Sequence, residues 1–145
     1  MEKFIPAFRK KLQDDPVVSE LASTVRYWRA PREPERLIKP VVVFNVNNFQ
    51  GKPETHGGAS TPQILVDIWG YDNEGSQIIE ATKLASRILN IVSMSRLEVE
   101  GGGTTRISAN TGFQVVNEQD PNTIHLQARF ITSYWSKDRI ELLNE

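Results

Sequence analysis

The sequence contains one pair of side chains of the types that general acid–base catalysis uses. Asp67 and His125 both fall on the less apolar faces of predicted strands, so neighbouring strands could bring the carboxylate within hydrogen-bonding reach of the imidazole. A structural contact on a half-exposed sheet would use the same two residues. Because a pair without a nucleophile or a metal specifies no reaction, we expect a protein that is not an enzyme.

Two glycine-rich segments contain the other residues that could bind a phosphate or act as a ligand or base. The segment Gly101–Thr105 (Gly-Gly-Gly-Thr-Thr) is similar to a phosphate-cradling loop, but such a loop needs a following helix, and the Walker form needs a lysine before the serine or threonine. The residues after it are β-prone, so we predict a flexible hairpin tip. His56 lies in a glycine-rich stretch where Glu54 is the nearby acid, and we predict an exposed loop histidine.

Composition excludes several kinds of site. With no cysteine and two histidines, the chain has no disulfide, thiolate nucleophile, cysteine-bound zinc or three-histidine metal site, and we predict no cofactor and no metal. A net charge of -1 gives no global attraction to nucleic acid or to an anionic membrane. The longest wholly apolar stretch, Val41–Phe44, is far too short to cross a membrane, and the N-terminus lacks a signal-peptide apolar region. We expect a soluble protein that works where it is synthesised.

One segment is locally basic. From Arg26 to Lys39 there are five basic and two acidic side chains, a local charge of +3, with Tyr27 and Trp28 among them. Basic residues interleaved with aromatics can hold single-stranded nucleic acid. Prolines interrupt the segment and the whole chain is not basic. We therefore expect Tyr27 and Trp28 to pack at the edge of the core while the arginines are solvated.

The elements that would position these residues start with two helices. At 145 residues, the chain has about the commonest size of one domain, and we expect residues 1–145 to fold as a single unit. A second, short helix is predicted where Asp15 can cap and Pro16 suits the first helical position. Apolar residues at four-residue spacing define the first helix: Phe4, Phe8 and Leu12.

An extended connector from Ala30 to Pro40 follows, because its prolines prevent regular structure. Strands are predicted from about Val41 to Asn47, buried on both faces, and from Gln63 to Tyr71, with one face in the core. Together they form a hairpin whose tip is the long loop from Phe49 to Thr61.

The second half begins with a four-turn amphipathic helix after Asp72 and Asn73, either of which can cap it. Short strand segments near Leu97 and Phe113 flank a loop from Gly101 to Asn110. One long final strand runs from Ile124 to Trp135. The helix has apolar residues at three- and four-residue spacing: Ile78, Ala81, Ala85, Ile88, Leu89 and Val92.

This order predicts an α+β fold, in which a mainly antiparallel sheet of four to five strands carries the long amphipathic helix and the N-terminal helix.

Several segments in this order resemble the tail terminator, or tail completion, proteins of long-tailed bacteriophages. They are Leu12–Val18 after the first helix, the Pro-Val-Val-Val strand at Pro40–Val43, and Val66–Asp72 (Val-Asp-Ile-Trp-Gly-Tyr-Asp) running into the helix Glu80–Val92. The final strand ends in aromatics at Phe130–Trp135. The order and spacing of the segments define the resemblance, because packing alone could explain each one.

The resemblance implies a structural virion protein without catalytic residues. Such a subunit forms a homo-oligomeric ring, expected to be a hexamer, that caps the head-proximal end of the tail tube and stops its polymerisation. Its partners are other copies of itself, the tail tube protein and a head-side connector or stopper protein, and DNA passes through the ring lumen without sequence-specific binding. It is assembled in the host cytoplasm and resides at the head–tail junction of the virion.

Two alternatives remain open: another neck or connector ring protein on the portal side, and a small cytoplasmic enzyme that uses Asp67 and His125. For the terminator, we expect the loops Phe49 to Thr61 and Gly101 to Asn110 to meet neighbouring subunits or the tube. The predicted partner-interface residues are Phe49, Gln50, Lys52, His56, Gly57, Gly102, Thr104 and Arg106.

Overall fold

The computed structural model describes residues 3–47, 62–72, 75–99, 101–104 and 106–136. The chain begins with helices α1 (Phe4–Gln13) and α2 (Pro16–Leu21), the short strand β1 (Val25–Tyr27) and a 3-10 turn, η1 (Pro34–Arg36). Strands β2 (Val41–Asn47) and β3 (Gln63–Tyr71) precede the longest helix, α4 (Ser76–Val92). The remaining strands are β4 (Glu98–Val99), β5 (Gly102–Thr104), β6 (Ser108–Val115), β7 (Thr123–Ile131) and β8 (Tyr134–Ser136).

Five strands form the main sheet in the order β1-β2-β3-β7-β6. β1 runs parallel to β2, and the other neighbours are antiparallel. β3 lies in the middle and pairs with β7 along its whole length, from Gln63 opposite Ile131 to Tyr71 opposite Thr123. β4, β5 and β8 form a smaller sheet. The predicted α+β class with a mainly antiparallel sheet is therefore confirmed.

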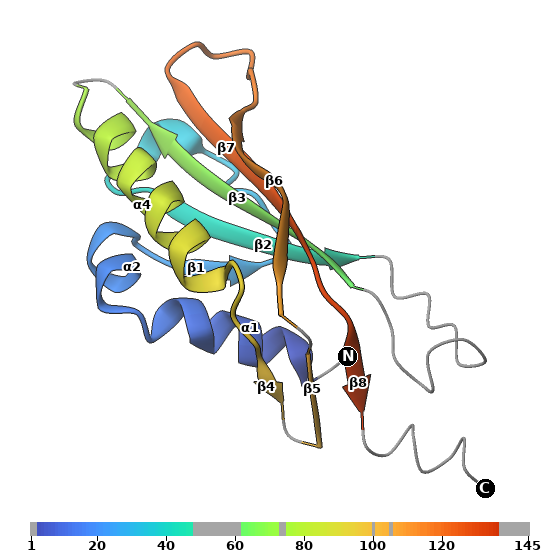
Figure 1. The fold of residues 1–145 in the computed structure, drawn as a ribbon. Coiled ribbons are helices and arrows are strands. Elements are labelled where there is room, and N and C mark those ends of the chain that lie inside the picture. Colours follow the sequence, from blue (N-terminus) through green and yellow to red (C-terminus); the bar gives the residue numbers. More distant parts are fainter. Residues whose placement is uncertain (1–2, 48–61, 73–74, 100, 105, 137–145) are drawn as a thin grey trace, which may run out of the picture.

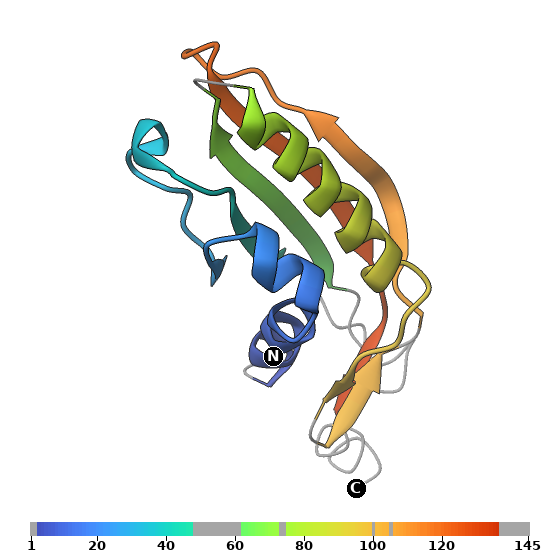
Figure 2. The same cartoon turned by 90° about the vertical axis from the view of Figure 1, so that its left-hand side faces the viewer.

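The three helices lie on one face of the main sheet (Figures 1 and 2). α4 runs along β3 and β7, with α1 and α2 beside it. Alternation along β3 turns Ile64, Val66 and Ile68 towards the helices, and all three side chains are fully buried. From α1, Phe8 packs on Phe44 of β2 with ring centroids 5.0 Å apart. One continuous core thus joins the helices to the sheet.

The boundaries predicted for the two strands of the hairpin are confirmed. β2 and β3 occupy the predicted segments 41–47 and 63–71, and they pair as an antiparallel hairpin. The first four residues of β2, Val41 to Phe44, are buried on both faces, as predicted. The tip of this hairpin, Phe49 to Thr61, lies outside the described residues.

The segment after α2 differs from the prediction. It contains β1, whose three residues are too few to show a period in the sequence. Tyr27 packs on Phe44 with ring centroids 5.3 Å apart, as expected for the edge of the core. The prediction was wrong for Trp28, which is 63% exposed. The backbone of Trp28 has a φ of 91°, which turns the chain out of the sheet as β1 ends.

The region from Gly101 to Asn110 is not the predicted loop. Gly102–Thr104 forms β5 between β4 and β8, and Ser108 begins β6. The predicted long final strand is also two strands. β7 ends at Ile131 because its partner β3 begins at Gln63, so the chain beyond this point has no neighbour in the main sheet. After Thr132 and Ser133 the chain forms β8, which pairs with β5 in the smaller sheet.

The buried face of α4 is shifted from the predicted one. Ala81, Ala85, Ile88 and Val92 are buried as expected, and Leu84 joins them. Ile78, in the first turn of α4, is 40% exposed because it lines an open pocket with the start of β7 and the end of β6.

This face gives a test of the fold. Ile88 is fully buried, whereas Ile79 on the same helix is 57% exposed. Ile88→Asp would place an unpaired charge in the core, and we expect it to lower the free energy of unfolding by several kcal/mol, a large part of a domain's total stability. The matched variant Ile79→Asp should change it by about 0.5 kcal/mol or less. Urea unfolding of both variants measures the difference, and equal effects would show that the buried face is misassigned.

Candidate functional site

The predicted acid–base pair is brought together on the sheet face opposite the helices. His125 Nε2 lies 2.6 Å from Asp67 Oδ1, and His125 Nδ1 lies 2.8 Å from Glu118 Oε1. Asp67 and His125 are both buried, and Glu118 comes from the connection between β6 and β7. Each ring nitrogen of the histidine therefore faces a carboxylate oxygen.

The sheet register explains this geometry. Trp69 lies directly opposite His125, and Gln127 lies directly opposite Asp67. The Trp69 and His125 rings stack with centroids 3.8 Å apart and planes 14° apart. Gln127 Nε2 donates to Asp67 Oδ1 at 2.9 Å. The directly opposed pairs Trp69–His125 and Asp67–Gln127, together with the diagonal contact between Asp67 and His125, thus hold the imidazole in a single orientation.

The two carboxylates determine the charge of this histidine. Burial lowers the pKa of His125, whereas hydrogen bonds and charge from Asp67 and then Glu118 raise it, and the net result is a pKa above the ordinary value of 6.5. The imidazolium form donates from both nitrogens, so it satisfies both carboxylates at once.

This arrangement is poorly suited to acid–base catalysis. A general base needs a ring nitrogen that can reach a substrate proton, and in this structure both nitrogens of His125 are already bound to carboxylates. The hydrogen bonds, the ring stack and the burial all describe a cross-strand ionic contact. Among the residues that the structure describes, no group of three or more side chains has the geometry to hold a metal ion.

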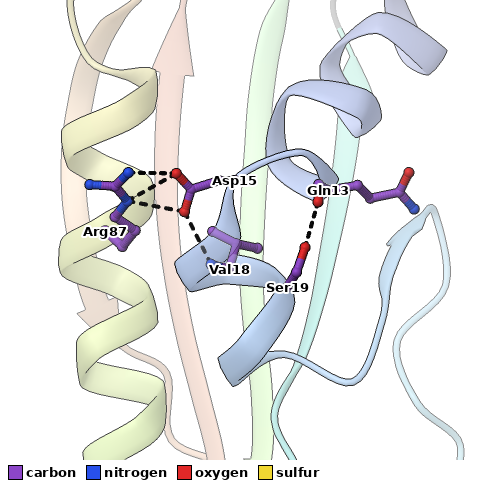
Figure 3. Close-up of polar contacts among 5 residues, drawn as sticks. All are labelled: Gln13, Asp15, Val18, Ser19 and Arg87. Carbon is purple, nitrogen blue, oxygen red and sulfur yellow. Dashed lines mark hydrogen bonds and ion pairs between the residues drawn. The ribbon is translucent and has the colours of Figure 1, made fainter.

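A second buried carboxylate joins two helices. Asp15 caps α2, where its Oδ2 accepts from the Val18 N–H at 3.1 Å. Arg87 of α4 donates to the same carboxylate, with Nη2 2.6 Å from Oδ1 and Nε 3.0 Å from Oδ2 (Figure 3). The hydrogen bonds from Arg87 hold the pKa of Asp15 below its ordinary value, against the opposing effect of burial and with support from Val18. This bidentate contact between the guanidinium and the carboxylate links α2 to α4.

The structure describes only part of the predicted partner interface. Phe49, Gln50, Lys52, His56 and Gly57 lie outside the described residues. Gly102 is half-buried in β5 and Arg106 is exposed. Thr104 is buried, and its hydroxyl accepts from the Leu97 N–H at 2.9 Å, so it already serves the β4–β5 hairpin within the subunit.

The roles of Glu118 and Arg87 in these contacts, and the exposure of Trp28, were not predicted from the sequence. Glu118 is seven residues before His125 across a turn, a separation at which a β-hairpin can bring two side chains together, so hairpin register could have indicated it. The cap at Asp15 was predicted, but Arg87 lies 72 residues away, and no sequence pattern links the two. The exposure of Trp28 depends on its backbone conformation, which the sequence does not show.

The sequence matches no protein-family model and no curated protein. The fold does match solved structures. A protein chain in the virion of a native gene transfer agent particle superposes with a TM-score of 0.70 at 14% identity, over 92% of this chain and 95% of that one. A second solved structure superposes with a TM-score of 0.54 at 12% identity, over 90% and 94% of the two chains. At these identities the similarity concerns the fold alone.

None of the helices in the described ranges is both long and apolar enough to span a membrane.

The Asp15 contact gives a test with two related variants. Asp15→Asn keeps an oxygen for the Val18 N–H but removes the charge that pairs with Arg87, whereas Asp15→Ala removes both interactions. We expect Asp15→Ala to cost about 1 kcal/mol more in the free energy of unfolding, the usual value of a helix N-cap. Because the pKa of Asp15 is lowered on folding, the wild-type contribution is present above pH 3.8 and lost as the pH falls through the folded-state pKa. As the pH is lowered, both variants should therefore lose less free energy of unfolding than the wild type, which unfolding curves at acid pH measure.

The His125 contact predicts the opposite pH dependence. Because its pKa is raised on folding, its contribution to the free energy of unfolding is complete below pH 6.5 and is lost as the pH rises through the folded-state pKa. His125→Gln still offers hydrogen bonds but does not titrate, so its stability should fall less between about pH 6 and about pH 9. Urea unfolding across this range measures both proteins, and parallel profiles would contradict the assignment.

Proposed function

We propose that the protein is a structural component of a virion. The observation that supports this most is the shared fold with a chain of a gene transfer agent virion, which extends over 92% of this chain and 95% of that one. A match over nearly the full length of both chains fits a subunit of the same kind better than a shared fragment. We take the whole chain, residues 1–145, to be one domain.

Within a virion, we assign the protein to the head-proximal end of the tail as a tail terminator. The basis is the ordered resemblance in sequence, from Leu12–Val18 to the aromatic end of the final strand. The protein then forms a ring, expected to be a hexamer, on the last ring of tube protein and offers its other side to a head-side connector or stopper. The protein acts by binding its partners and closing the end of the tube, and this needs neither a cofactor nor a reactive side chain.

A ring requires an interface between two different surfaces of the subunit, because a self-complementary patch would give a closed dimer. Residues of the loop from Phe49 to Thr61, together with Gly102 and Arg106, are assigned to contacts with neighbouring subunits or the tube, whereas Thr104 is buried and is left out of this assignment. The lumen admits DNA without reading its sequence, in keeping with the net charge of -1.

The decisive experiment adds the purified protein to polymerising tail tube protein. We expect the protein to bind one end of each tube, to appear there as a ring in electron micrographs, and to stop elongation at that end. Weak association in solution is compatible with this result, because a ring makes several contacts at once on a symmetric tube end. Cells infected with a phage that lacks the protein should accumulate full heads and tails that do not join.

The control is the Ile88→Asp variant, which we expect to be too unstable to act and which should leave tube growth unchanged. If tubes reach the same length with and without the wild-type protein, and the protein binds only a head-side connector, the terminator assignment is wrong. The portal-side neck protein then takes its place.

A further inference from the structure

Trp28 is an exposed aromatic side chain held in a costly backbone conformation. Its φ of 91° lies in the left-handed region, which a bulky residue adopts only at a cost in free energy. The Trp28 N–H donates to the Phe44 carbonyl at 3.0 Å, and this bond fixes the conformation at the end of β1. The side chain is nevertheless 63% exposed. Folding of the subunit thus places a large apolar ring in solvent at the edge of the sheet.

The side chains around this edge are basic. Arg26, Arg29 and Arg32 are all exposed on the same segment. Arg26 bonds only to the hydroxyl of Thr24, and within the described residues Arg29 and Arg32 have no ion-pair partner. An exposed tryptophan beside arginines has the composition of an interface hot spot, in which both residue types are enriched. We call Trp28 with these three arginines the Trp28 surface.

An apolar pocket lies at the opposite edge of the main sheet. Its volume is about 310 Å³, and it is formed by the first turn of α4, the start of β7 and the end of β6. Its lining combines the apolar residues Ile78, Val115, Pro121 and Leu126 with polar residues that include Asp72 and His125, and Val115 is 73% exposed. The exposure of Ile78, unexpected for an amphipathic helix, belongs to this pocket. We call it the Ile78 pocket.

The rim of the Ile78 pocket is acidic. Asp72 lines the pocket, and Asp120 directly precedes the lining residue Pro121 in the β6–β7 connection. Glu118 of the same connection is already paired with His125, which also lines the pocket, so Asp72 and Asp120 supply the acidic charge. The two surfaces are therefore complementary in both respects: an exposed aromatic ring with basic neighbours, and an apolar hollow with acidic neighbours. Complementary charge aligns partners and disfavours contacts between two like surfaces.

The two surfaces lie at opposite edges of the sheet. The sheet order places β1 at one edge and β6 at the other, with three strands between them. Figure 2 shows the segment around β1 and η1 on one side of the sheet and β6 on the other. Two different surfaces on opposite edges can join copies only head to tail, and such contacts generate rings or filaments.

We propose that the Trp28 surface of one subunit docks into the Ile78 pocket of a second copy of this chain. This rests on the proposed function in one respect, that the resulting head-to-tail series closes into a ring. Trp28 fills the hollow between α4 and β7 of its neighbour, while Arg29 and the other arginines face the acidic rim. The costly backbone conformation of Trp28 then forms when the subunit folds, before assembly. The Trp28 side chain is therefore already positioned when two subunits meet.

Cross-linking tests this directly, because the chain contains no cysteine. One protein carries Arg29→Cys and another carries Gln119→Cys, an exposed position between Glu118 and Asp120. A short bismaleimide linker should join a mixture of the two into dimers with a yield about tenfold above that of either protein alone. Adding Trp28→Ala to the first protein should weaken the association at least about tenfold, as for a hot-spot tryptophan. Higher salt should also reduce the yield.

Met94→Ala is the matched control, because Met94 is 61% exposed and also has a positive φ, of 64°, but belongs to neither surface. It should leave the yield unchanged. Thermal unfolding verifies that Trp28→Ala remains folded. Equal yields from the mixture and from the single proteins, or full yield with Trp28→Ala, would overturn the proposal.

This test needs no tail tubes, so its failure is separate from that of the proposed function. If the mixture cross-links as expected but tubes grow unchecked, the interface stands and the terminator role falls. If the protein caps tubes but the mixture does not cross-link, the role stands and the ring uses other surfaces.

Discussion

β3 is hydrogen-bonded to a strand on each side, and the rest of the structure depends on that position. Seven of its nine residues, Gln63 to Trp69, pair with β2 on one side, and all nine pair with β7 on the other. One face of β3 supplies the middle of the apolar core beneath the helices, and the other face supplies Asp67 and Trp69. A shift of one residue in either pairing would exchange these two faces. The core and the ionic cluster are therefore specified by the same register.

Two buried carboxylates extend this order to neighbouring elements. Asp67 joins β3 to β7 through His125, and Asp15 joins α2 to α4 through Arg87. Each carboxylate also accepts a further hydrogen bond, from Gln127 or from the Val18 N–H. Removing one partner of a buried ion pair leaves an uncompensated charge, so each pair disfavours a packing in which its partner is absent. They fit a subunit whose surfaces must be presented in one geometry.

The sequence predicted the parts of the fold that depend on local periodicity. The limits of β2 and β3, the cap at Asp15 and most of the buried face of α4 follow from residue spacing and burial. The sequence did not predict features decided by distant partners. Arg87 reaches a carboxylate 72 residues away, β8 leaves the main sheet because β3 has ended, and the exposure of Trp28 follows from a single backbone angle. For the site, Asp67 and His125 were predicted to meet, whereas Glu118, which occupies the second ring nitrogen, was not.

The position of β3 also has a consequence for biosynthesis. Its partner β7 follows it by more than fifty residues, with α4, the smaller hairpin and β6 between them. During translation β2 and β3 leave the ribosome as a hairpin while one edge of β3 is still unpaired. Such long-range pairing is slow and leaves unpaired strand edges open to aggregation. The nascent chain must keep that edge free of other chains until β7 emerges, so the sheet can be completed only after β7 has left the ribosome.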